Sequence, residues 1–505
     1  MGRGCPVSTS PASTAAAVPA PGAADFEARL KTYVETTKPL RAKAEQSVSD
    51  GKNPSQQAAV LDQRRATLSQ SICDMRAQAK PGDLFTPTGA AHIKRVIDAA
   101  FAGPGAAAIR DALEEQNDPT LYKGKNHKLV LNERIAAPLL PAILIADLPP
   151  LPKEVEYRFL GRALILADAE STCSLDYLEG ALPEAPAQAA PKAPTQPVAI
   201  KTLDFLRMPR VARSLRFAAL GDTGTGTLAQ RKVAETLWNF YSQDNRFKFI
   251  LLLGDNLYAA LERTSDYRRE FLDPYKQILD GRVQFWATLG NHDLAGQVDF
   301  APFSMGGKTY YSFKDHNVKF VSLNSNTPTD PEQLKWLDEQ FKGEDGWRIC
   351  FFHHPLYSSG THARESRQMR GLLEKSLVKN NVNVVFSGHE HFYERSKPQQ
   401  GIVYFVNGGA AQLRMGDLHP QSFTDFGYDR ENSFMILEIA GDEMFYQAMG
   451  VSGRTIDCGI VYRTTDASTK GAADKVTQDW LHQCDTARSW LAKRPEGSQQ
   501  VSGRP

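Results

Sequence analysis

Five short apolar runs between residues 216 and 391 each end in side chains that can bind metal ions. The runs, with the letters that follow them, are RFAAL before GDTG, FKFILLL before GDNLY, VQFWATL before GNHD, WRICFF before HHP, and VNVVFS before GHEH. They supply carboxylates, an amide oxygen, a phenol and imidazoles, on Asp222, Asp255, Tyr258, Asn291, His353, His389 and His391. Hard oxygen donors mixed with imidazole suit iron, manganese or zinc. Metal ions held in this way activate water for hydrolysis.

Each motif alone also has a simpler explanation. A GD pair often forms only a turn, in which Gly takes a positive φ and Asp caps a helix. GDTGTG is similar to a phosphate-binding loop, but no GK[ST] follows it. Asn291 can stabilise a turn, and His353 and His354 can be core histidines. All five motifs in this order favour the metal site, because ligands at the carboxyl ends of successive strands converge on one edge of a sheet.

The segments between these motifs have the spacing of amphipathic helices. They are LAQRKVAETLWNFY, YRREFLDPYKQIL, PEQLKWLDEQF and SRQMRGLLEKSLVKN. Two other stretches predict β-hairpins, one turning at residues 315–317 and one at Gly441 and Asp442. Short apolar runs that alternate with helices predict a layered α/β domain over residues 212–463.

The remainder of the chain predicts four further segments. Residues 1–24 form a flexible segment, and residues 25–182 form a mostly helical α+β domain with two strands near its end. Residues 183–211 are a Pro/Ala-rich linker, and residues 464–505 are a polar tail with one helix near residues 478–492. The N-terminal domain carries no chemical motif. Its stretches KPGDLFTP and LPPLPKEVEYRFLGRALILAD resemble segments of exported bacterial proteins.

Composition limits the classes of partner. The chain has 505 residues, 41% of them hydrophobic, and a formal net charge of +1. This near-neutral balance predicts no nucleic-acid partner. The longest apolar runs are interrupted well below the roughly 20 residues that span a bilayer. No apolar core of a signal peptide is visible near the start.

The cysteines predict structural roles, because no CxxC pair is present. Cys350 lies in an apolar run and is expected to be a small buried side chain. Cys73 with Cys173, and Cys458 with Cys484, are candidate disulfides in an oxidising compartment, although the sequence does not fix the pairing. Cys5, before a flexible segment, is also a candidate lipid anchor.

The order GD, GDxxY, GNH, HxP, GHxH resembles the signature of the calcineurin-like metallophosphoesterases over residues 216–410. Many members have His where this chain has Gly224, and here Tyr258, three residues after Asp255, supplies the missing donor. This combination resembles the purple acid phosphatase branch. The resemblance implies a two-sheet β-sandwich flanked by helices, two metal ions and hydrolysis of small phosphorylated substrates.

The resemblance also implies a role for each residue. A ferric ion is expected at Asp222, Asp255, Tyr258 and His391, and a second ion, Fe(2+), Zn(2+) or Mn(2+), at Asp255, Asn291, His353 and His389. His353 is preferred to His354 because the family ligand precedes Pro by two residues. His292 is expected to protonate the leaving group, and His362 to face the substrate. Asn256, Asp293 and Glu390 either support these ligands or hold turns.

The expected function is that of an acid phosphatase, in which a metal-bound hydroxide attacks phosphate monoesters at acidic to neutral pH. Two alternatives remain open: a phosphodiesterase of the same fold, and a non-catalytic module that binds metal or phosphate. A periplasmic or secreted location is expected from the exported-protein resemblance. The sequence leaves the oligomeric state open.

Overall fold

The computed structural model describes residues 23–46, 51–116, 129–183, 206–243, 246–463 and 475–492. Nearly all of the predicted flexible segment, Cys5, most of the Pro/Ala-rich linker and parts of the polar tail lie outside these ranges. Within the described ranges, the structure has no helix that is both long enough and apolar enough to span a bilayer.

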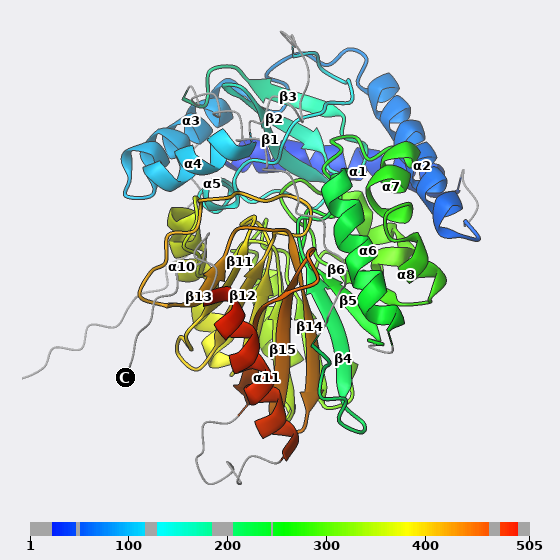
Figure 1. The fold of residues 1–505 in the computed structure, drawn as a ribbon. Helices are drawn as coiled ribbons and strands as arrows, with labels where there is room; N and C mark the ends of the chain where they lie inside the picture. Colours follow the sequence, from blue (N-terminus) through cyan, green and yellow to red (C-terminus); the bar gives the residue numbers. More distant parts are fainter. Residues whose placement is uncertain are drawn as a thin grey trace, which may run out of the picture.

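The N-terminal region packs helices against a small antiparallel sheet at one end of the molecule (Figure 1). Its helices are α1 (Ala23–Gln46), α2 (Pro54–Met75), α3 (Pro87–Ala102), α4 (Ala106–Gln116) and α5 (Ala142–Ile145), and its strands are β1 (Val155–Leu160), β2 (Ala163–Asp168) and β3 (Ser174–Leu178). The prediction of two strands missed β3. This strand contains Asp176, a residue type that is rare in strands, which is buried and accepts hydrogen bonds from the backbone N–H groups of Leu84 and Phe85.

The predicted α/β domain contains two sheets. The first has the order β16 (Thr455–Tyr462), β15 (Glu443–Gly450), β14 (Ser433–Ala440), β4 (Leu215–Leu220), β5 (Phe249–Leu252), β6 (Gln284–Ala287). The second has the order β13 (Thr424–Tyr428), β11 (Tyr393–Ser396), β12 (Val403–Asn407), β10 (Val384–Ser387), β9 (Trp347–Phe351), β8 (Val318–Ser322), β7 (Tyr311–Asp315). The hairpins β7–β8 and β14–β15 turn where the sequence predicted.

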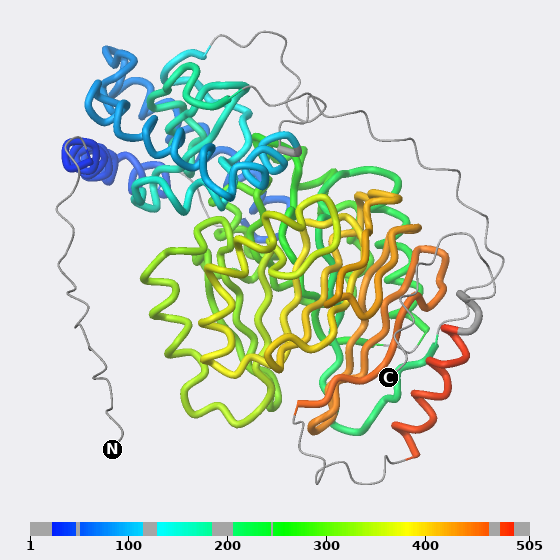
Figure 2. Tube along the Cα trace, turned by 90° about the vertical axis from the view of Figure 1, so that its left-hand side faces the viewer, coloured from blue at the N-terminus to red at the C-terminus, as the bar shows by residue number. Residues whose placement is uncertain are grey.

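The two sheets pack face to face around an aromatic core (Figure 2). Phe217 of the first sheet contacts Phe320 and Phe386 of the second edge-on, with ring centroids 5.3 and 6.2 Å apart. Strands β4, β5 and β6 are parallel to one another, as are β8, β9, β10 and β12. The motifs therefore end on two facing sheets and not, as predicted, at one edge of a single sheet.

Helices cover the outer faces of this sandwich (Figure 1). They are α6 (Leu228–Ser242), α7 (Thr264–Tyr267), α8 (Lys276–Asp280), α9 (Pro331–Gln340), α10 (Ala363–Lys379) and α11 (Lys475–Ala492), with a short π-helix η1 (Arg268–Leu272) and two short 3-10 helices, η2 (Ala295–Asp299) and η3 (Ala301–Phe303). The segment YRREFLDPYKQIL is mostly helical, as expected, but it is not one continuous helix. Its ladder breaks into η1 and α8 because Pro274 has no backbone N–H to donate.

The cysteines occupy three different environments. Cys458 on β16 and Cys484 on α11 form a disulfide, as predicted, and it fastens the last described helix to the sheet. Cys350 is buried in β9, as predicted. Cys73 and Cys173 are thiols whose sulfur atoms lie 3.2 Å apart, so the second candidate pair is adjacent but not bonded.

Candidate metal centre

The turns after β4 and β5 place two carboxylates at the ends of neighbouring strands. Asp222 and Asp255 both adopt the left-handed conformation, with φ of 57° and 51°, and the Asp222 N–H donates to the Gly254 carbonyl. Such conformations are costly for residues other than glycine and concentrate at functional sites. A Cβ on Gly290 would lie 2.1 Å from the Asp255 carboxylate, and one on Gly388 would lie 2.5 Å from the Asp222 carboxylate. These two positions therefore have room for the carboxylates only because the residue is glycine.

The first group of predicted ligands surrounds the Asp222 carboxylate. Asp222 Oδ1 lies 3.3 Å from the Tyr258 hydroxyl and 3.3 Å from His391 Nε2. The hydroxyl and the imidazole nitrogen are 3.4 Å apart. Oxygen and nitrogen atoms of three of the four residues expected at the ferric site therefore lie within 3.4 Å of one another.

The second group surrounds the Nε2 atom of His353. Asn291 Oδ1 lies 2.8 Å from it and His389 Nδ1 lies 3.2 Å from it. His353 Nδ1 is 2.9 Å from the Leu253 carbonyl oxygen, a contact in which Nδ1–H donates and Nε2 is left as a lone-pair donor. This hydrogen bond explains why His353 has the orientation of a ligand.

Asp255 joins the two groups. Its Oδ1 lies 3.5 Å from His353 Nε2, and ligand atoms of Asp222, Asp255 and His353 all fall within 4.8 Å of one another. All seven predicted ligands are buried. Buried carboxylates this close to one another and to imidazole lone pairs favour a bound cation, which offsets their repulsion and desolvation. The donor set therefore fits a pair of metal ions.

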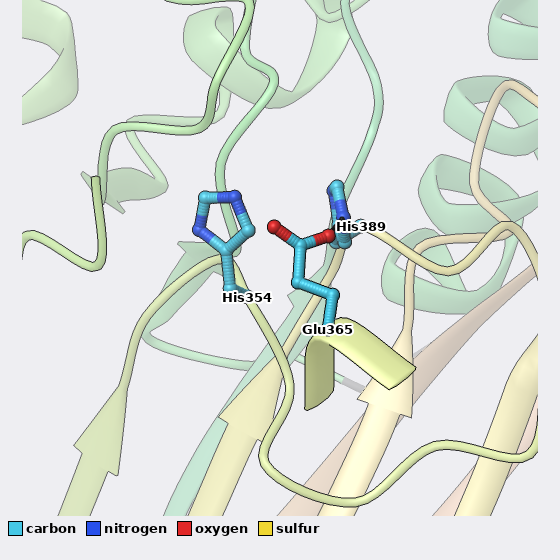
Figure 3. Close-up of side chains that lie close together, drawn as sticks. All are labelled: His354, Glu365 and His389. Atoms are coloured by element: carbon cyan, nitrogen blue, oxygen red, sulfur yellow. Dashed lines mark hydrogen bonds and ion pairs between the residues drawn. The ribbon is translucent and has the colours of Figure 1, made fainter. Parts of the chain in front are cut away.

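A second cluster lies beside His389 and was not foreseen. Figure 3 shows Glu365, from the start of α10, between His354 and His389, and Glu365 Oε2 is 3.0 Å from His389 Nε2. This contact directs the other nitrogen of His389, Nδ1, toward His353. The His354 ring lies 5.1 Å from that of His353 and 4.6 Å from that of His389, so His354 neighbours the predicted ligands, and its Nδ1 lies 2.9 Å from the Ser325 hydroxyl.

Each of the two predicted catalytic histidines lies beside a predicted ligand. The His292 ring packs on Tyr258, with centroids 4.6 Å apart, and its Nε2 lies 4.0 Å from Asp255 Oδ2. His362 is fully buried, and its ring lies 4.4 Å from that of His389. Its Nδ1 is 3.2 Å from Glu390 Oε2. Both histidines therefore lie at the cluster of predicted ligands.

Asp293 and Asn256 hold the two turns that carry Asp255 and Asn291. Asp293 Oδ2 accepts hydrogen bonds from the backbone N–H groups of Asn256 and Gly290, at 3.2 and 2.8 Å. Burial, followed by the nearby carboxylates of Asp255 and Glu262, raises the pKa of Asp293. The expectation that Asp293 and Asn256 hold turns or support ligands agrees with these contacts.

Comparison with known proteins finds relatives for the part of the chain that carries these residues. The family profile described as Calcineurin-like phosphoesterase matches residues 215–393. Purple acid phosphatase 5 of Arabidopsis thaliana is 31% identical over 204 residues, 38% of this chain and 48% of that protein. Fe(3+)-Zn(2+) purple acid phosphatase 12 of the same plant is 29% identical over 220 residues, 38% of this chain and 46% of that protein. The chain thus spans about half the length of the curated relatives it matches.

Among the solved structures to which this chain is similar is a purple acid phosphatase from yellow lupin seeds. The two proteins share 16% sequence identity, and the TM-score is 0.43. The matched region covers 62% of this chain and 61% of the lupin protein. Residues 215–393 form a calcineurin-like metallophosphoesterase domain, whose homologues include the plant purple acid phosphatases.

Proposed function

We propose that this chain is a two-metal phosphoesterase that hydrolyses small phosphate monoesters at acidic to neutral pH. The observation that carries the proposal is the convergence of two donor groups on the shared carboxylate Asp255. The Tyr258 group is proposed to hold a ferric ion, and the His353 group Fe(2+), Zn(2+) or Mn(2+). The match to a plant enzyme named for Fe(3+) and Zn(2+) supports this assignment.

The residues divide the chemistry between them. When bound, the metal ions supply an activated water and positive charge for the phosphoryl oxygens. Asp255 lies between the groups and is proposed to bridge them. His292, whose ring packs on Tyr258, is proposed to hold the proton for the leaving oxygen. His362, beside His389, is proposed to contact the substrate.

The test is a comparison of matched aryl phosphate monoester and diester substrates, using protein loaded with iron and zinc, from acidic to alkaline pH. A preference for the monoester below neutrality supports the proposal. A preference for the diester would replace it with a phosphodiesterase that uses the same metal centre. A protein that binds both metals but hydrolyses neither substrate would favour a non-catalytic module.

The ferric assignment has its own spectroscopic test. A phenolate bound to ferric iron absorbs visible light, so the iron-loaded protein should be coloured and Tyr258→Phe should lose the colour. Tyr311→Phe is the matched control, because the Tyr311 hydroxyl donates to the Ala287 carbonyl and not to a predicted ligand. A visible band that survives in Tyr258→Phe would contradict the assignment.

A periplasmic or secreted location is proposed on two grounds. The Cys458–Cys484 disulfide is a bond that persists in oxidising compartments. The N-terminal stretches resemble exported proteins. Fractionation of cells that express the protein tests the location, and recovery only in the cytoplasm would contradict it.

A further inference from the structure

Helix α2 of the N-terminal region inserts a buried arginine between the loops of the metallophosphoesterase domain. Arg65 is 1% exposed, and its guanidinium donates to the carbonyl and to the carboxylate of Glu262, each at 3.0 Å. The same guanidinium lies 3.2 Å from the Tyr267 hydroxyl, which also donates to Glu262. A planar guanidinium with several partners imposes a geometry that a single point charge does not.

Glu262 connects Arg65 to the loop after β6 through hydrogen bonds. It is fully buried, has a positive φ of 42°, and follows the turn that bears Tyr258. Its second carboxylate oxygen accepts from the Leu294 backbone N–H at 2.7 Å and from the Gln297 side-chain amide at 2.5 Å. The Gln297 amide also donates to Asp293 Oδ1 at 2.7 Å.

Asp293 completes the connection to the predicted ligands. It accepts from the backbone N–H groups of Asn256 and Gly290. These residues directly follow Asp255 and directly precede Asn291 in the sequence. An unbroken chain of hydrogen bonds between buried groups therefore runs from helix α2 to the turns of two ligands, one of them the proposed bridge.

We propose that Arg65 is a positioning residue for the metal centre. By holding Glu262 in place, it fixes the turns that carry Asp255 and Asn291 through the chain of hydrogen bonds just described. The N-terminal region, which has no chemical motif of its own, thus supplies part of the support for the site. The inference rests on the metal centre proposed above, but not on which phosphate ester is hydrolysed.

The experiment measures the affinity of the full-length metal-free protein for Zn(2+) by competition with a chelator. Groups that orient metal ligands change metal affinity by about 10- to 100-fold, and Arg65→Met should weaken binding about tenfold. Arg65→Met leaves the Glu262 carboxylate buried without its cation, which destabilises the fold. The double variant Arg65→Met/Glu262→Gln removes that charge, and should fold while still binding Zn(2+) about tenfold more weakly.

Arg76→Met is the matched control, because Arg76 directly follows the same helix. The Arg76 guanidinium donates to Asn132 and to the Leu175 carbonyl, both within the N-terminal region, so its loss should leave Zn(2+) affinity unchanged. Wild-type affinity in a folded Arg65 variant would overturn the inference while leaving the proposed function intact. A wild-type protein that neither binds metal nor hydrolyses phosphate esters would overturn both.

Discussion

His292 is the residue through which the proposed reaction can be tested most directly. Its side chain is 6% exposed, and its backbone N–H donates to Asp255 Oδ1 at 3.0 Å, a bond that His292→Asn retains. The substitution removes the imidazole that can protonate a leaving oxygen, together with its ring contact to Tyr258. General acid catalysis contributes about 10²- to 10⁴-fold in rate, so kcat for an alkyl phosphate should fall by that factor, which corresponds to about 3–5 kcal/mol.

The assay compares two monoesters whose leaving groups differ in basicity. An alkoxide must be protonated as it leaves, whereas a dinitrophenolate leaves as the anion. The loss in His292→Asn should therefore be large for the alkyl ester and much smaller for the dinitrophenyl ester, with unchanged metal content. His316→Asn is the control, because His316 lies exposed on the β7–β8 turn. An equal loss for both esters would refute the proton-donor role, and so would no loss for either.

Three further predictions follow from contacts around the site. Glu365→Gln removes the charge that faces His389 Nε2, and since charged hydrogen bonds exceed neutral ones by about 1 kcal/mol, Zn(2+) affinity should fall about fivefold in chelator competition. Burial raises the pKa of Glu394 from 4.5 to about 7, so its protonated form stabilises the fold below pH 4.5 and this stabilisation is lost as pH rises through about 7. Between these pH values the free energy of unfolding of the wild type should fall by up to about 3 kcal/mol; Glu394→Gln should remove this fall, so that its Tm declines less over the same interval. Mild oxidation should join Cys73 to Cys173, detected as a mass loss of two hydrogens and a linked peptide.

Each of these predictions has an outcome that contradicts it. For Glu365, the control is Glu374→Gln on the same helix, which accepts from the Tyr357 hydroxyl; equal affinities in the two variants would remove Glu365 from ligand support. For Glu394, a Tm profile identical to that of the wild type would show that this carboxyl does not titrate in the interval. For the thiols, unchanged mass under conditions that oxidise a surface thiol would show that the pair is inaccessible.

The convergence of the predicted ligands could be foreseen because each of these residues belongs to a local sequence pattern. Asp255 and Tyr258 stand three residues apart after an apolar strand, and a Cβ on Gly254, directly before Asp255, would lie 2.5 Å from His353. The hairpins were equally predictable, since Gly441 and Asp442 interrupt two alternating runs. In both cases the physical cause lies within a few residues of the pattern.

The supporting residues were not predictable, because their partners are remote in the sequence. Glu365 lies on a helix whose spacing indicates only a buried face, and it meets His389 across the loop that follows β9. Arg65 and Glu262 are charged residues, which are normally exposed, and nothing nearby in the sequence indicates that they will be buried against each other. Which face of which sheet a motif reaches is likewise decided by packing.

The pairing of β4 with β14 has a consequence for biosynthesis. Ala219, near the end of β4, pairs with Met435 on β14. All seven predicted ligands lie between these two residues in the sequence. Until the ribosome has delivered β14, one edge of β4 has no neighbour, and exposed strand edges are prone to pair with other chains. The emerging polypeptide therefore carries all its ligand residues before it can close the sheet that aligns them.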